Sequence, residues 1–336
     1  MKLTAKERFY KALRKEKVDA FAIGSPVSMI STEVMDACGA YFPEAHTNPE
    51  KMALLAGAGH RITGFDNVMP VFSVVTESAA FDAPTDWGHK NIMPSTKEYI
   101  WKEASDINLS DKFLDSLPAQ TVLKALTILS KEFKDNVSVT GKVFGPWTLG
   151  LHMFGIEDFL MWTITEPEKV KEIMAKLKTI TLKFALAQIK AGADTICVGD
   201  HATRDLCSPE TYRDFVLPLH KELAKEIPVP VMLHICGNTS DRIRYINDTG
   251  FAGFHYDSKS TDEKIAELAS PKLALIGGTD NPTLMRLGTK AEFWKDIETK
   301  LKFKVDILGP ECAVPLDTPL KNLKMFADYR KEKFGV

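Results

Sequence analysis

The segment TICVG at residues 195–199 decides the interpretation of the fold, because it is a short apolar run between two amphipathic stretches. A long helix is predicted before it, over residues 168–190. A second helix is predicted to begin after it, with Ser208 as the N-cap residue. The next apolar run follows at residues 229–234. Strand, helix and strand in this order indicate a parallel βαβ unit with a right-handed crossover.

The same alternation extends in both directions along the chain. Eight short apolar runs are predicted as strands, at residues 20–24, 67–72, 137–141, 195–199, 229–234, 252–256, 273–278 and 304–308. Further helix starts are predicted at Ser240, Thr261, Thr289 and Thr318. Eight such units predict an α/β protein with one closed (β/α)₈ TIM-barrel domain over residues 1–336. A doubly wound open sheet is the alternative, and no Gly-x-Gly-x-x-Gly motif follows the first run to support it.

Two additions to the barrel are predicted. An amphipathic helix over residues 4–15 forms an N-terminal extension, and a long insertion over residues 73–136 separates the second and third strands. Within the insertion we expect a small hairpin around residues 77–90 and a helix over residues 120–133. Both additions leave the eight-strand pattern intact.

The composition excludes several classes of protein. With 43 Lys and Arg against 45 Asp and Glu, the net charge is −2, which argues against a broad nucleic-acid surface. No apolar run reaches about 18 residues, so no membrane span is predicted. The charged N-terminal segment has no signal-peptide core, and the five cysteines are an odd number, which favours free thiols in a reducing compartment. We therefore expect a cytoplasmic protein.

Three residues at predicted strand ends suggest a metal centre. In a parallel barrel the functional end is the carboxyl end of the strands, and there the fifth run reaches His234 and Cys236. Residues two apart on an extended chain point to the same side, and imidazole with thiolate suits zinc. Cys312 follows the eighth run and can reach across the mouth. Three ligands with an open fourth position are typical of catalytic zinc. The alternative is that these cysteines are small buried apolar side chains, as expected for Cys38, Cys197 and Cys207.

Motifs along nearly the whole chain point to a known family. They are PEAHTNPE at 43–50, GPWT at 145–148, GAD at 192–194, SPETY at 208–212, HICGN at 234–238, GPEC at 309–312 and TPL at 318–320. With them the chain resembles the uroporphyrinogen decarboxylase-like superfamily, and within it the methylcobamide:coenzyme M methyltransferases. The resemblance implies that His234, Cys236 and Cys312 are the zinc ligands and the catalytic centre. The decarboxylases carry an Arg-rich N-terminal motif, whereas residues 23–29 here contain no arginine.

The resemblance also implies a reaction: a methyl group moves from protein-bound methylcobalamin to a zinc-activated thiol, coenzyme M. The chain lacks the Asp-x-His-x-x-Gly signature of a cobalamin module, so a methylated corrinoid protein has to bring the cofactor. Other readings stay open. They are a methoxy, methylamine or halomethane donor demethylated onto Co(I), a tetrahydrofolate acceptor, porphyrin decarboxylation, and a metal-binding scaffold without turnover. The sequence leaves the oligomeric state open.

Other polar residues near predicted strand ends are weaker candidates. Asp200 either orients a metal ligand or caps the next segment, and Glu77 is a candidate labile fourth ligand. Pocket lining or ordinary turn chemistry is expected for Tyr256, Asp257, Asp280 and Asn281. If the acceptor carries a sulfonate, Arg204 and Lys142 are the candidate cations. Surface or packing roles are expected for His60, His89, His152 and His220. Residues 277–281 and Asp317 depart from the pattern of the methyltransferases in two loops that are expected to face the mouth.

Overall fold

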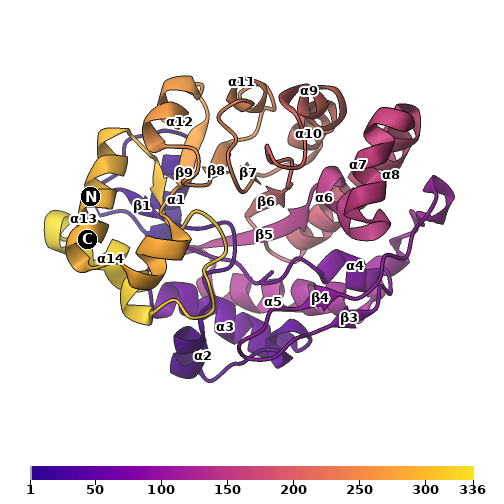
Figure 1. The fold of residues 1–336 in the computed structure, drawn as a ribbon. Helices are drawn as coiled ribbons and strands as arrows, with labels where there is room; N and C mark the ends of the chain where they lie inside the picture. Colours follow the sequence, from indigo (N-terminus) through magenta and orange to yellow (C-terminus); the bar gives the residue numbers. More distant parts are fainter. Residues whose placement is uncertain (1) are drawn as a thin grey trace.

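Eight parallel strands form the centre of the molecule (Figure 1), as seen in a computed structural model that describes residues 2–336. Their order around the barrel is β1-β10-β9-β8-β7-β6-β5-β2. The strands are β1 (Ala22–Ile23), β2 (Asn67–Val68), β5 (Ser138–Phe144), β6 (Thr195–Gly199), β7 (Val231–His234), β8 (Gly253–Tyr256), β9 (Ala274–Gly277) and β10 (Ile307–Leu308). Each predicted run overlaps one of these strands, and β5 extends past its run to Phe144, so the predicted (β/α)₈ TIM barrel is confirmed. Met1 lies outside the described residues.

The barrel closes between β1 and β2 through side chains as well as backbone. Asp66 donates its backbone N–H to the Ile23 carbonyl at 2.7 Å, and its Oδ2 accepts the Ile23 N–H at 2.9 Å. Asn67 bonds Ser25 in both directions, accepting from the N–H at 3.1 Å and donating to the carbonyl at 2.8 Å. These two polar side chains satisfy backbone groups that a longer strand pair would have satisfied.

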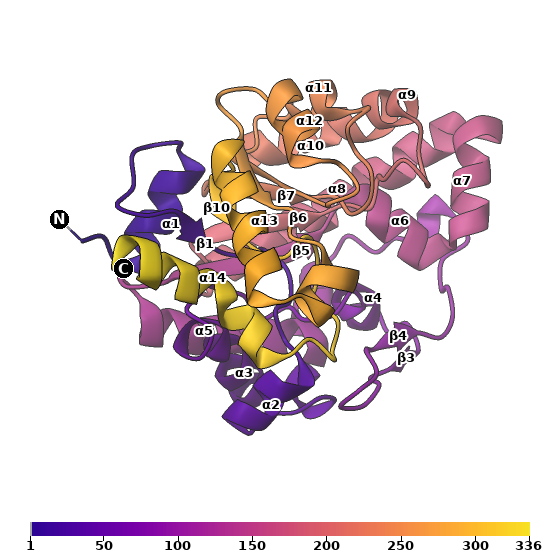
Figure 2. The same cartoon turned by 60° about the vertical axis from the view of Figure 1, so that its left-hand side comes forward.

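Helices surround the strands on the outside (Figures 1 and 2). They are α1 (Ala5–Leu13), α2 (Thr32–Cys38), α3 (Pro49–Arg61), α4 (Thr76–Ala80), α5 (Leu117–Phe133), α6 (Pro146–Phe154), α7 (Ile156–Thr165), α8 (Pro167–Lys190), α9 (Pro209–Thr211), α10 (Leu217–Glu226), α11 (Ile243–Ile246), α12 (Asp262–Leu268), α13 (Lys290–Lys302) and α14 (Leu320–Phe334). Ser208, Thr261 and Thr289 are N-caps as predicted. The predicted start at Ser240 was wrong, because its hydroxyl bonds Asn238 within a turn and α11 begins only at Ile243. None of the described helices is long and apolar enough to cross a bilayer.

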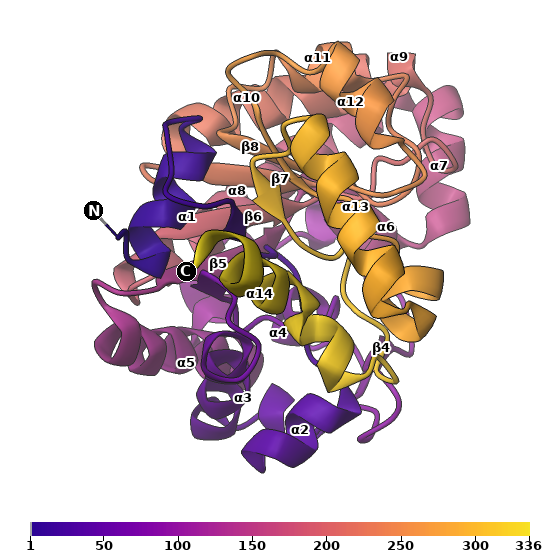
Figure 3. The ribbon, with the colours of Figure 1, turned by 90° about the vertical axis from the view of Figure 1, so that its left-hand side faces the viewer.

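Helix α1 seals the amino-terminal end of the barrel. Its Phe9 and Leu13 are buried in one cluster with Met232, Ile276 and Ile307 from three different strands. Thr4 and Glu7 form a capping box that fixes the start of the helix. The bottom of the barrel is therefore closed by apolar packing, and ligands have to enter at the opposite end. Figure 3 shows α1 beside the last helix, with the two termini close together.

The insertion between β2 and β5 differs from its prediction in one place. A short helix, α4, occupies residues 76–80, and the hairpin lies further on, with β3 (Thr85–Asp86) antiparallel to β4 (Ser95–Thr96). The hairpin expected at residues 77–90 was therefore wrong in position. Residues 76–80 become helical because they bury Glu77 and Ala80 in contact with the helices beside them, which outweighs a weak local preference. The expected helix of this segment is α5.

Strand register sets which side chains meet inside the barrel. Phe144, Gly199, His234 and His255 occupy the same level on the neighbouring strands β5, β6, β7 and β8. Side chains alternate along a strand, so these four positions face the interior together at the carboxyl ends. The functional end of the barrel is thus lined by an aromatic ring, a gap at glycine and two imidazoles.

Candidate metal centre

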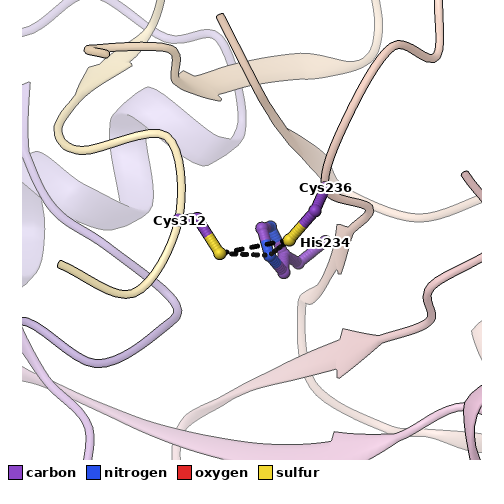
Figure 4. Close-up of side chains that lie close together, drawn as sticks. All are labelled: His234, Cys236 and Cys312. Carbon is purple, nitrogen blue, oxygen red and sulfur yellow. Dashed lines mark hydrogen bonds between the residues drawn. The ribbon is translucent and has the colours of Figure 1, made fainter. Parts of the chain in front are cut away.

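His234, Cys236 and Cys312 converge at the mouth of the barrel (Figure 4). His234 is the last residue of β7, Cys236 lies in the loop after it, and Cys312 comes from the loop after β10. The Nε2 atom of His234 is 3.0 Å from the Cys236 sulfur and 3.5 Å from the Cys312 sulfur, and the two sulfurs are 3.1 Å apart. The cysteines are free thiols. The fifth and eighth predicted strands are β7 and β10. The ligand atoms that follow them therefore lie within 3.5 Å of one another.

The donor set and the spacing fit a zinc ion. Usual zinc bond lengths in a tetrahedral site place two sulfurs about 3.8 Å apart and a sulfur and a nitrogen about 3.5 Å apart. The distance between the two sulfurs and that from His234 to Cys236 are shorter than this, and that from His234 to Cys312 matches it, so small side-chain movements are enough to seat an ion. His234 is 2% exposed, whereas both cysteines are only half-buried. The site is therefore anchored inside the barrel and reached from its mouth.

A second imidazole fixes the orientation and tautomer of His234. The Nδ1 atoms of His234 and His255 are 2.8 Å apart, and His255 Nε2 is 2.8 Å from the Pro310 carbonyl oxygen. That carbonyl can only accept, so His255 donates from Nε2 and accepts at Nδ1. His234 must then donate from its own Nδ1. Its Nε2 is left with a free lone pair facing the two sulfurs, which is the form that binds a metal.

Burial and neighbouring charges keep the ligands in suitable protonation states. Burial lowers the pKa of His234 well below its usual value, and the nearby His255 and Lys142 act in the same direction. Burial likewise lowers the pKa of His255 to about 4. The hydrogen bond from Cys236 lowers the pKa of Cys312, which burial opposes and the charge of Lys142 supports. Both imidazoles are thus neutral at pH 7, and Cys312 is the thiol that loses its proton more easily.

Hydrogen bonds between loops hold the ligands in place. Asp257, after β8, accepts the Gly237 N–H at 2.8 Å and so fixes the turn that follows Cys236. Asn281 donates to the carbonyls of Cys312 and Ala313 at 3.1 and 2.9 Å. Glu311 accepts the N–H groups of Ser258 and Asn281, each at 2.9 Å. Four loops are joined in this way, and Asn281, a predicted lining residue, lies directly behind a ligand.

The structure places the remaining candidates elsewhere. Asp200 is fully buried and bonds Thr148 and His220, at 2.7 and 2.9 Å, instead of contacting the His234 ring. Tyr256 donates its hydroxyl to Asp262 on α12 at 2.5 Å, and Asp280 caps the short helical segment η5 (Asn281–Met285). These two are structural contacts and not part of the three-residue group.

Glu77 is also not brought into this group. Its Oε1 accepts the Phe144 N–H at 2.8 Å, and its Oε2 is buried without a partner among the described residues. Burial raises the pKa of Glu77 to about 7, against the opposing effects of its backbone hydrogen bonds and of Lys142. The carboxyl therefore lies beside β5 and does not belong to the group whose ligand atoms lie within 4.8 Å of one another.

The role of His255 was not predicted from the sequence, whereas the burial of His220 agrees with the packing role that was one of its two expected alternatives. His220, expected at the surface or in packing, is completely buried and bonded through both ring nitrogens, to Asp200 at 2.9 Å and to Tyr212 at 3.0 Å. A signal for His255 was present, because the fifth and sixth runs both place a histidine near their carboxyl ends. Aligning the two parallel strands at those ends would have paired His234 with His255.

Comparison with known proteins shows what this chain is similar to over nearly its full length. Residues 4–333 match the family described as Uroporphyrinogen decarboxylase (URO-D). A Methylcobamide:CoM methyltransferase MtbA from Methanosarcina acetivorans is 31% identical and covers 98% of each chain. A Methylated-thiol–coenzyme M methyltransferase from Methanosarcina mazei is 29% identical over 98% of this chain and 90% of its own.

A solved structure shows the same fold over the full length. A methyltransferase from Methanosarcina mazei has a TM-score of 0.95 and 28% identity, and the match covers 98% of this chain and 99% of that one. The structural likeness therefore extends over nearly the whole of both chains. Because the family match extends over nearly every residue, the chain belongs to the uroporphyrinogen decarboxylase (URO-D) family.

Proposed function

We propose that this methyltransferase moves a methyl group from a corrinoid, brought by a partner protein, to a thiol, and that coenzyme M is the acceptor. The observation that carries the proposal is the meeting of His234, Cys236 and Cys312 at the barrel mouth. Relatives similar over nearly the full length are named methylcobamide:CoM methyltransferases, which supports both substrates. The five free thiols agree with a reducing compartment, and we propose the cytoplasm.

We propose that these three residues hold Zn²⁺. A bound zinc ion would supply a way to deprotonate a thiol at neutral pH while leaving its sulfur nucleophilic. The residues prepare the site for that ion. His255 keeps the Nε2 atom of His234 free, and Asn281 holds the loop of Cys312. Two cysteine sulfurs make the donor set electron-rich, which suits activation of a nucleophile better than polarisation of an electrophile.

The position of the site suits a large methyl donor. Helix α1 closes the other end of the barrel, so both substrates have to approach from the mouth. The reaction forms a carbon–sulfur bond, breaks the carbon–cobalt bond with its electron pair left on cobalt, and releases the thiol proton. The half-buried cysteines place this chemistry near the surface, where a corrinoid held by another protein can reach it.

Porphyrin decarboxylation is not supported by the corresponding part of the chain. Uroporphyrinogen decarboxylase from Carboxydothermus hydrogenoformans is 32% identical, but the match covers only 38% of this chain. Residues 22–31 are buried and contain no arginine. The acidic side arms of a porphyrin would find no cation in this segment.

A methylcobalamin assay tests the proposal. Zinc-loaded protein is mixed with methylcobalamin and, in separate reactions, coenzyme M, other thiols and tetrahydrofolate, and the loss of methylcobalamin is followed by absorbance. We expect demethylation with coenzyme M and its methyl thioether as the product. Cys312→Ala should abolish the reaction. Turnover with tetrahydrofolate alone, or full activity in protein freed of metal by a chelator, would refute the proposal.

A further inference from the structure

The sulfur atoms of Cys236 and Cys312 lie closer together than a bound zinc ion would hold them. They are 3.1 Å apart, whereas two thiolates on one tetrahedral zinc ion are separated by about 3.8 Å. A disulfide bond is about 2.05 Å long, so the two sulfurs have to approach each other by only about 1 Å to form one. Figure 4 shows the two side chains coming from opposite sides, with their sulfurs directed toward each other. The pair is therefore placed for a sulfur–sulfur bond as well as for a metal.

The loops that carry these two sulfurs are held in place by contacts that involve no metal. Asp257 accepts the Gly237 N–H at 2.8 Å, directly after Cys236. Asn281 donates to the carbonyl of Cys312 at 3.1 Å. Groups that a fold holds near reacting distance behave as though they were present at a very high concentration. Removal of the metal by a chelator should therefore leave the two thiols together and favour a bond between them.

The other three cysteines are not arranged in this way. Cys197 and Cys207 are 0% and 6% exposed, and burial raises the pKa of their thiols to about 12 and about 11. Cys38 is half-buried, and its thiol contacts a backbone carbonyl of its own helix at 3.7 Å. Among the described residues, Cys236 and Cys312 are the only two cysteines that share a hydrogen-bond contact. An oxidant that enters the mouth therefore meets one pair of accessible thiols.

We propose that Cys236 and Cys312 form a reversible disulfide when the metal is removed, and that this bond prevents the site from being loaded again. The inference rests on the proposed function in that the same two sulfurs are the metal ligands. With hydrogen peroxide as the oxidant, one thiol sulfur attacks a peroxide oxygen and becomes a sulfenic acid as water leaves. The second thiol sulfur then attacks the sulfenic sulfur and forms the S–S bond as another water molecule leaves. Two electrons thus pass from the thiols to the peroxide. Dithiothreitol reverses the change by thiol–disulfide exchange and is itself oxidised.

Such a bond would make metal loading depend on the redox state of the surroundings. The metal ligand is a thiolate and not a disulfide sulfur, so the oxidised protein would keep only the His234 nitrogen for an ion. Bound zinc in turn would occupy both sulfurs and shield them from the oxidant. The disulfide and the metal-bound site therefore exclude each other. The reversible bond also spares the sulfurs from sulfonic acid formation, which is irreversible.

Exposure of chelator-treated protein to hydrogen peroxide tests the inference. Thiols are counted with a chromogenic disulfide reagent under denaturing conditions, and tryptic peptides are mapped by mass spectrometry. We expect two of the five thiols to be lost, with the peptide of residues 226–242 linked to that of residues 305–321. Reduction with dithiothreitol should restore all five thiols. Zinc-loaded protein should keep its five thiols over the same exposure.

Two variants and a zinc measurement complete the test. Cys312→Ser should form no cross-link, whereas the control Cys207→Ser should form the same cross-link as the wild-type protein. In competition with a chromophoric chelator, the oxidised wild-type protein should bind no zinc until it is reduced. Survival of all five thiols in chelator-treated protein, oxidation without the cross-link, or normal zinc binding by the cross-linked protein would overturn the inference. Absence of methyl transfer to any thiol would instead refute the proposed function, and the cross-link would still be measured without turnover.

Discussion

His255 is not one of the three candidate ligands, but it controls one of them through a hydrogen bond to His234. Its two hydrogen bonds, each 2.8 Å long, determine which nitrogen of His234 is free. Outer hydrogen-bond partners of metal-binding histidines typically change metal affinity by ten- to a hundred-fold when they are removed. The sequence contains both histidines, but their contact depends on the pairing of two strands.

We predict that His255→Phe weakens zinc binding about ten- to hundred-fold, because His234 loses the acceptor that fixes its tautomer. His255→Gln should restore part of the affinity, since a glutamine amide can accept from one side and donate to the other. Competition with a chromophoric chelator measures both. His220→Phe is the control, because His220 is equally buried but bonds Asp200 and Tyr212. Unchanged affinity in His255→Phe would contradict the assigned relay.

Glu77 gives a prediction about pH. Burial raises its pKa from 4.5 to about 7, so the folded protein holds this proton more tightly than the unfolded chain does. The free energy of unfolding should therefore fall as pH rises from 4.5 to 7, by about 3 kcal/mol from this group. Glu77→Gln keeps the acceptor for Phe144 and should remove that fall, becoming more stable than wild type at pH 8. Urea unfolding of chelator-treated protein across this range tests it, and parallel pH profiles would contradict it.

At the scale of elements, the strand ends determine where side chains meet. Continuous apolar runs identified all eight strands, since a parallel barrel buries both faces of each strand. The short segment at residues 76–80 was harder to assign, because its helix is stabilised by packing that the local sequence does not reveal. The convergence of Cys312 with His234 followed from the barrel topology, whereas the hydrogen bonds of Asn281 depend on loop conformations that have no simple sequence signal.

Gly277, the last residue of β9, allows this dependence on the strand ends to be tested. Gly277 has a φ of +90°, and a Cβ there would lie 2.5 Å from Nε2 of His255 and 3.1 Å from the Pro310 carbonyl. Gly277→Ala should therefore separate these two groups, reduce stability by about 2 kcal/mol or more and weaken zinc binding. Gly39→Ala is the control, because Gly39 has a similar φ of +74° with open space around it. It should lose only about 1 kcal/mol and bind zinc normally, and equal behaviour of the two variants would count against this explanation.

At the scale of the whole molecule, one buried charge cluster links the two ends of the chain. Asp66 is 2.6 Å from Arg330 on α14 and 3.3 Å from Arg8 on α1, and it also bonds the backbone of β1. Because Arg8, Asp66 and Arg330 are far apart in the sequence, no local sequence pattern predicts their contact. The cluster closes the barrel at the seam between β1 and β2.

We predict that Asp66→Asn lowers the free energy of unfolding by about 3–5 kcal/mol, because the buried guanidinium of Arg330 loses its carboxylate and Arg8 keeps only Asp19. The matched control is Glu332→Gln. Glu332 pairs with Lys290 at 3.4 Å, with both side chains about half exposed, so its loss should cost less than about 1 kcal/mol. Urea unfolding of both variants measures the difference. Similar losses would show that the seam does not depend on Asp66.

The proposed function depends on a metal held by one nitrogen and two sulfurs, and zinc stoichiometry tests this most directly. Wild-type protein and Cys312→Ala are dialysed against the same buffered zinc concentration and analysed by elemental mass spectrometry. We expect one zinc per wild-type chain and nearly none in the variant, while circular dichroism shows both to be folded. Equal zinc content in the two proteins would contradict the central claim.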